Sequence, residues 1–178
     1  MASAKDDRFL QLLQDNRSAI INAWHQAIVN TYPEKTAHFL TSQKDPFANP
    51  IGATISREIK VIFDELLLEE STEKLADSID ALVRIRAVQD FPPSQAVAFF
   101  QGLKKVVRKQ AGQQIQEEEL LRQLAVFDDR VDQLCLLAFD AYMRCREKIW
   151  ELRAKESQNR VSNLLKRMTH MNGNASDE

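Results

Sequence analysis

The sequence predicts an all-helical protein, and three observations support this prediction. Only 4 glycines and 5 prolines occur among 178 residues, below the roughly 7% and 5% that are usual for these residues, so the chain has few places to turn. The β-branched and aromatic runs typical of strands are missing. Apolar residues instead recur every three or four positions, which is the spacing of an amphipathic helix.

The prolines divide the chain into helical blocks, because all five lie between positions 33 and 50 or at 92 and 93. The first block runs from about Asp6 to Tyr32, with a break expected near Asp15–Asn16, where both side chains compete with helix formation. A short helix after Pro33 ends near Leu40. The next three blocks cover residues 51–66, a helix with Ser71 as its N-cap, and a helix from Pro92–Pro93 to about Gly112.

The last block is the longest, because nothing interrupts the chain from Glu117 to Gly173. A helix reaching Met168 would be about 75 Å long, whereas a compact domain of this size has a radius of gyration of about 15 Å. This helix must therefore project beyond its own core or break in the polar stretch 153–160, and both alternatives remain open. We expect a helical domain over residues 1–153, a helical extension over 154–171 and a disordered tail over 172–178.

The last block also carries apolar residues at heptad-like spacing. Two interpretations are equally favoured: the core-facing stripe of one buried helix, or a seam between two chains. A second group follows the polar stretch and is too far along the helix to reach the main core easily. The candidate dimer or partner interface comprises Leu134, Ala138, Cys145, Ile149, Leu152, Val161, Leu164, Leu165 and Met168.

Charge, hydropathy and cysteine usage indicate a cytoplasmic protein that does not bind nucleic acid and has no membrane span. The net charge is −2, so general attraction to nucleic acid is not expected. The longest apolar run, Leu134 to Phe139, is far shorter than the roughly 20 residues of a membrane span, and the polar N-terminus does not resemble a secretory signal. Cys135 and Cys145 lie about 15 Å apart on one helix, too far for a disulfide, and free thiols fit a reducing compartment.

Residues that could carry chemistry are scattered. The three histidines, His25, His38 and His170, are not grouped with other metal ligands, and the chain between Ile51 and Gly112 contains no histidine that could serve as a haem ligand. No phosphate-binding loop or nucleophile elbow is present. We therefore expect a protein that is not an enzyme and has no catalytic residues, cofactor or metal site, although an active site assembled from distant residues would leave no such motif.

Four stretches resemble a known family. They are YPEKTAHFL (32–40), DPFANPIG (45–52), IRAVQDFPPSQAVAF (85–99) and FDAYMRCREKIWELR (139–153). Together they resemble the RsbRD-type N-terminal domain, found in co-antagonists of the stress-signalling kinase RsbT. The similarity extends from about Asn16 to Arg153, and its most specific part surrounds Arg86, Asp90 and Pro92.

This resemblance implies a globin-like bundle without haem that dimerises and passes a signal along a projecting C-terminal helix. In relatives a STAS domain follows that helix, whereas this chain ends at Glu178, so we expect a free-standing sensor or docking domain. Its expected partners are a second copy, a regulatory or enzyme protein, and a small apolar ligand. The alternative function is an accessory or maturation factor for a partner enzyme.

Overall fold

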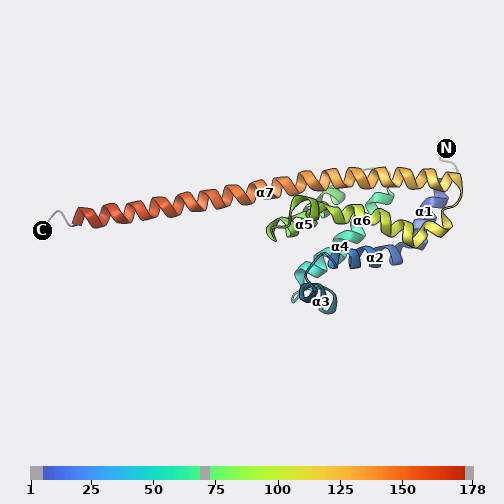
Figure 1. The fold of residues 1–178 in the computed structure, drawn as a ribbon, viewed down its shortest axis with the longest axis horizontal. Helices are drawn as coiled ribbons and strands as arrows, with labels where there is room; N and C mark the ends of the chain where they lie inside the picture. Colours follow the sequence, from blue (N-terminus) through green and yellow to red (C-terminus); the bar gives the residue numbers. More distant parts are fainter. Residues whose placement is uncertain (1–5, 69–72, 175–178) are drawn as a thin grey trace.

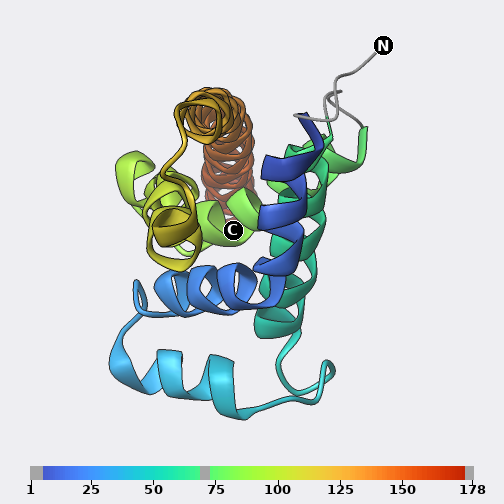
Figure 2. The ribbon, with the colours of Figure 1, turned by 90° about the vertical axis from the view of Figure 1, so that its right-hand side faces the viewer.

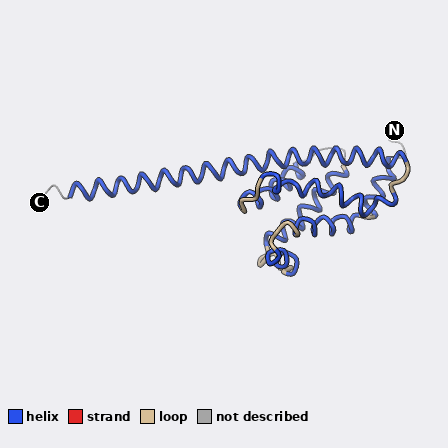
Figure 3. The backbone as a smooth tube through the Cα atoms, in the orientation of Figure 1, coloured by secondary structure: helices blue, strands red, loops and turns tan. Residues whose placement is uncertain are grey.

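In the computed structural model the backbone is described for residues 6–68 and 73–174, and side chains for residues 8–68 and 73–166. Within these ranges every regular element is helical (Figure 3), which confirms the predicted fold class. In chain order the elements are α1 (Asp6–Asp15), α2 (Arg17–Val29), α3 (Glu34–Ser42), α4 (Pro50–Leu67), α5 (Glu73–Val88), α6 (Pro93–Ala111), a 3-10 turn η1 (Gly112–Gln114) and α7 (Glu118–Asn174).

The helices α1 to α6 form a body on one side of the first part of α7 (Figure 1). Helix α7 packs mainly against α5 and α6, while α4 pairs with α5 and α2 pairs with α6. The end-on view places α3 farthest from α7, below α2 (Figure 2). Large side chains such as Trp24, Phe63 and Phe100 fill the core with no exposed surface, and the Trp24 indole donates a 2.8 Å hydrogen bond to the Phe99 carbonyl.

The predicted helix boundaries agree closely with the structure where proline or asparagine supplies a local signal. Asn16 separates α1 from α2, as expected. Asn49 caps α4 by accepting a 2.9 Å hydrogen bond from the Gly52 amide, and its own amide donates to the carbonyls of Leu40 and Gln43. A side chain at Gly52 would collide with the Asn49 amide, so this cap requires glycine there. The predicted Ser71 cap lies outside the described residues.

Helix α7 settles the choice between a break and a projection. It is continuous from Glu118 through Asn174, and its second half extends well beyond the body (Figure 1). All side chains from residue 151 to 166 are exposed. Residues 172–174, expected in a disordered tail, belong to this helix, because a single glycine near a helix end lowers its stability without preventing it.

Candidate functional site

The residues predicted for the interface fall into two groups in the structure. Leu134 and Ala138 are buried within the chain's own core, and Cys145 and Ile149 pack against that core while partly exposed. The remaining described members are 54–59% exposed; they are Leu152, Val161, Leu164 and Leu165. The Met168 side chain lies outside the described residues. The interface prediction itself remains a prediction, and only its second half is largely exposed.

Helix α7 carries a second row of apolar residues, of which only Val161 and Leu164 were predicted as interface residues from the sequence. Leu136 lies about 200° around the helix axis from buried Leu134, so it points away from the body, and it is 68% exposed. The row continues on the same side of α7 into the projecting half of the helix, with steps of three, four, seven, eleven and three residues. We call it the outer stripe: Leu136, Phe139, Met143, Trp150, Val161 and Leu164, all exposed. Only its first part, from Leu136 to Met143, follows the three- and four-residue spacing of the buried row.

The turn between α5 and α6 covers an unusual buried cation. Arg86, near the end of α5, is 2% exposed, and its guanidinium carbon lies 4.4 Å from the Tyr32 ring centroid, 4.3 Å from that of Phe91 and 5.4 Å from that of Phe99. One guanidinium nitrogen donates a 3.4 Å hydrogen bond to the Ile28 carbonyl, while Nη1 has no partner. Cation–π attraction therefore replaces the carboxylate that usually accompanies a buried arginine.

This environment disfavours the charge on Arg86 without removing it. Burial lowers the pKa of the Arg86 guanidinium from its ordinary value, and the Tyr32 hydroxyl acts in the opposite direction. An arginine nevertheless stays protonated in proteins. The ring of Phe91 contacts both Arg86 and, edge to face at 5.4 Å, Tyr32, so the turn is packed against the junction that follows α2.

The outer side of the same turn is attached to α7. Asp90 adopts a left-handed conformation with φ of 57° and forms ion pairs with Arg146 and, at 3.5 Å, with Arg153. Arg146 also donates to the Ala87 carbonyl at 3.1 Å, and the Tyr142 hydroxyl donates to the Phe91 carbonyl. We call the two ion pairs of Asp90 the Asp90 latch. The hydrogen bond from Arg146 lowers the pKa of the Asp90 carboxyl, which keeps it ionised.

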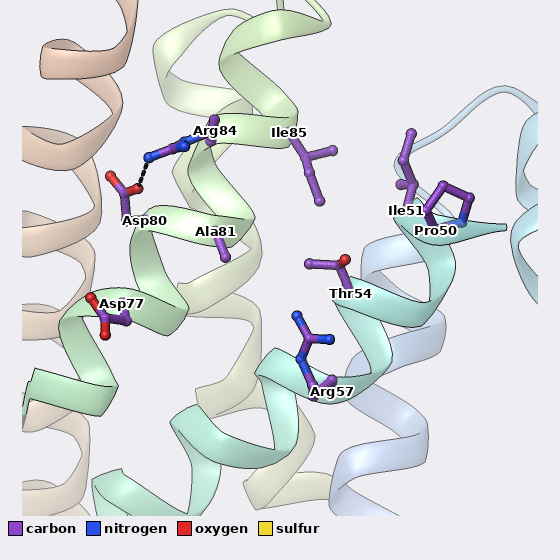
Figure 4. Close-up of a pocket in the computed structure, with 9 residues that line it drawn as sticks. All are labelled: Pro50, Ile51, Thr54, Arg57, Asp77, Asp80, Ala81, Arg84 and Ile85. Atoms are coloured by element: carbon purple, nitrogen blue, oxygen red, sulfur yellow. Dashed lines mark hydrogen bonds and ion pairs between the residues drawn. The ribbon is translucent and has the colours of Figure 1, made fainter. Parts of the chain in front are cut away.

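A groove of about 430 Å³ lies between α4 and α5 (Figure 4). Ile51, Ala81 and Ile85 give it an apolar floor. Two arginines line it as well, but Arg57 is paired with Glu58 at 2.7 Å and Arg84 with Asp80 at 2.5 Å. Asp80 also lies 3.9 Å from the Cys145 sulfur on α7. The groove therefore has room for a small molecule, and both of its arginines are already paired with carboxylates, while Asp77 also lines it.

The two cysteine thiols are poorly suited to nucleophilic chemistry. Burial raises the pKa of the Cys135 thiol to about 11, and burial followed by the nearby Asp80 raises that of Cys145, so both stay protonated. His25 lies 3.1 Å from the Ser56 hydroxyl, and burial lowers its pKa. Among the described residues no group of histidine, cysteine and acidic side chains could hold a metal ion, and none of the described helices could cross a membrane.

The fold and this junction define an all-helical domain that presents one long helix, and comparison with known proteins places it in a family. The family model described as "RsbT co-antagonist protein rsbRD N-terminal domain" matches residues 18–157. An uncharacterized protein of Archaeoglobus fulgidus is 26% identical over 164 residues, covering 92% of this chain and 99% of that protein. No solved structure matches the chain. The chain belongs to the RsbRD N-terminal domain family, a group of regulatory, signalling-related domains, as its sequence motifs predicted.

Within the family match, the most specific predicted motif coincides with the turn that contacts α7. In the sequence, Arg86, Asp90 and Pro92 were recognisable only as marks of the family. The structure shows Arg86 inside the aromatic cage, Asp90 in the latch and Pro92 as the residue preceding α6. The sequence did not reveal their contact partners, because Tyr32 lies more than fifty positions from Arg86, and Arg146 more than fifty positions from Asp90.

Proposed function

We propose that this chain is a dimeric signal-input domain in which the body receives a signal or partner and α7 carries it outward. The observation that carries this proposal is the outer stripe, an apolar row on a helix whose described side chains from 151 to 166 are all exposed. An exposed apolar row is costly in water at about 25 cal/mol per Å², and large exposed apolar patches mark interaction sites. A second copy of the same helix is the partner that its spacing favours.

The outer stripe has the repeat of a coiled coil. Residues in one set lie seven positions apart, and each is followed four positions later by a residue of a second set. This is the spacing of the d and a positions of a heptad, with the first set at d and the second at a. The first set is Leu136, Met143, Trp150, Ser157 and Leu164. The second set is Asp140, Glu147, Ala154 and Val161, with Met168 next in the sequence, so both sets are free of charge only from Trp150 onward. From Trp150 to Leu164 this uncharged seam is about 21 Å long.

The charges beside the stripe favour a parallel arrangement of the two helices. Arginines 146, 153 and 160 follow one another at steps of seven on one flank, and Glu151 lies on the other flank. In a parallel pair, the g position of one helix meets the e position five residues later in its partner, so Arg146 would face Glu151 of the second copy. An antiparallel pair would place the arginine flanks against each other, which like charges disfavour.

A specific observation also supports the alternative, an accessory or docking factor for a partner enzyme. Phe47 is 97% exposed in a loop held by a 3.0 Å hydrogen bond from its amide to Asp45 and by the Asn49 contacts that follow. Phe39 of α3, 47% exposed, is also available on the part of the body farthest from α7. Rigid exposed aromatic residues are common anchors in protein interfaces. A small apolar ligand in the α4–α5 groove is a separate proposal.

The test of the dimer compares two leucines of equal exposure on the same helix. Leu164 belongs to the outer stripe and is 59% exposed, whereas Leu152 is 57% exposed and lies off the stripe. We expect Leu164→Glu to weaken dimerisation by at least about tenfold, because it places a charge in the seam, and Leu152→Glu to leave it nearly unchanged. Sedimentation velocity over a concentration series measures both.

Truncation after Arg153 gives a second measurement on the same proposal. It removes most of the projecting half of α7 and keeps every contact of the Asp90 latch. We expect weaker dimerisation with nearly the same thermal midpoint at concentrations where the full chain is monomeric. A large loss of stability in that monomer, with association intact, would show that the projecting half supports the body and not the dimer. If Leu152→Glu alone weakened the dimer, the seam would lie on the opposite face.

A further inference from the structure

The Asp90 latch uses an arginine that the proposed seam also needs. Arg146 has a side chain only 19% exposed, held by Asp90 and by the Ala87 carbonyl, whereas Asp90 itself is 56% exposed. In the parallel pair the same guanidinium would face Glu151 of the second copy. Glu151 now contacts Lys148 of its own helix at 3.2 Å, and both side chains are about 70% exposed. One cation therefore has two competing acidic partners, one within the chain and one across the seam.

We propose that Asp90 restrains dimerisation by holding Arg146 and Arg153 on the body, so that a movement of the α5–α6 turn releases them to the seam. This inference rests on the proposed dimer and names its regulation. The latch holds the arginines at the body flank of α7, and releasing Asp90 lets Arg146 pair with Glu151 of the second copy. Trp150, a member of the outer stripe, lies 5.8 and 5.9 Å from the two guanidinium carbons, so the latch also fixes the charges around a seam residue.

The inner side of the turn connects the latch to the body. Asp90 is followed directly by Phe91, whose amide donates to the Arg86 carbonyl at 3.2 Å and whose ring lies against Arg86 and Tyr32. The unpartnered Nη1 of Arg86 makes this arrangement less favourable than a fully paired buried cation. A ligand or partner that displaces Tyr32 at the end of α2 would therefore move Phe91, and with it Asp90.

The experiment replaces Asp90 by asparagine in the full chain. Asparagine tolerates the left-handed backbone that Asp90 adopts, so Asp90→Asn removes the charge and preserves the turn. The matched control is Asp64→Asn, which makes the same change of net charge and removes the ion pair with Arg17, at 2.6 Å, without touching α7. We expect Asp90→Asn to tighten dimerisation about two- to fivefold, the range of one exposed ion pair, and Asp64→Asn to leave it unchanged.

Two further measurements test whether tighter dimerisation comes from release of the two arginines: tryptophan fluorescence of the monomer and the dimer affinity of a double variant. At concentrations where the chain is monomeric, Asp90→Asn should shift the fluorescence of Trp150 while the buried Trp24 contributes equally in both proteins. The gain in dimer affinity should disappear when Glu151→Gln is added, because the cross-chain partner is then missing. If Asp90→Asn and Asp64→Asn dimerise with equal affinity, or if the Asp90→Asn dimer is weaker, Asp90 does not compete with the seam for Arg146. Either result would overturn the proposal, whatever the fluorescence shows.

Failure of the proposed dimer gives a different pattern of results. If the native chain and the Asp64→Asn variant stay monomeric at high micromolar concentration, the dimeric function is contradicted for the latched protein. An Asp90→Asn chain that dimerises under those conditions would still support the restraint. An Asp90→Asn chain that also stays monomeric would overturn it.

Discussion

Leu134 and Leu164 are the same residue type on the same helix, but they differ in exposure and packing. Leu134 is 1% exposed and packs on α5 and α6, whereas Leu164 is 59% exposed. The first half of α7 is held by the body, by the Tyr142 hydroxyl and by the Asp90 latch. The second half is supported along its own length by contacts such as the 2.5 Å pair of Arg160 with Glu156, each worth only a few tenths of a kcal/mol.

This difference shows that helix formation and burial are separate properties of one continuous element. An isolated helix is marginal in water unless a packed face stabilises it, so the body nucleates α7 and the second half extends from it. The second half therefore gains most from a partner, while the first half already buries one apolar face in the core. The family match, residues 18–157, ends four residues after Arg153, which still contacts the body through Asp90.

The largest expected effect is on the free energy of unfolding, and it appears when one leucine is replaced in each half of α7. Leu134→Ala should lower the free energy of unfolding by about 2–4 kcal/mol, because it leaves a cavity in the core. Leu164→Ala should change it by less than about 0.5 kcal/mol in the monomer, as for other exposed positions. Urea denaturation at a concentration where dimers are absent measures both. Similar losses for the two variants would mean that the second half is folded against the body in solution.

Substitutions of Arg86 test which interactions hold the α5–α6 turn, which anchors the first half of α7. Arg86→Ala should cost about 2–4 kcal/mol, because it empties the space between Tyr32 and Phe91 and removes the cation–π contacts. Arg86→Met keeps the volume and removes an incompletely paired charge, so it should cost less than about 1 kcal/mol. If Arg86→Met proved as harmful as Arg86→Ala, the charge itself would be what the cage requires. Thermal unfolding of the two variants decides between these outcomes.

The smallest effect is a pH dependence confined to the body. Burial lowers the pKa of His25 below its ordinary value, so the unfolded chain binds a proton more readily than the folded chain as the pH falls from about 7 to about 5. This difference lowers stability as the pH falls. His25→Gln should reduce the pH dependence of the urea midpoint over this range. An unchanged profile in His25→Gln would assign the dependence to other groups.

Most of the local structure was predictable because its signals lie close together in the chain. Asn16 separates α1 from α2 and α6 begins at Pro93, directly after Pro92, as expected, since capping and proline geometry act over a few residues. The candidate site was predicted only in part. Val161 and Leu164 are exposed as the interface prediction requires, but Leu134 and Ala138 serve the core, and Leu136 and Trp150 were overlooked.

The sequence by itself determined that the chain is helical, where its helices begin, and which family it belongs to. It also determined that α7 is apolar on more than one side, because periodicity records which faces avoid water. Only the tertiary structure decided which apolar face the body covers and which is left for a partner. It alone placed Asp90 beside Arg146 and Tyr142 beside Phe91, pairs separated by 56 and 51 positions, because contacts between distant residues depend on how whole helices pack.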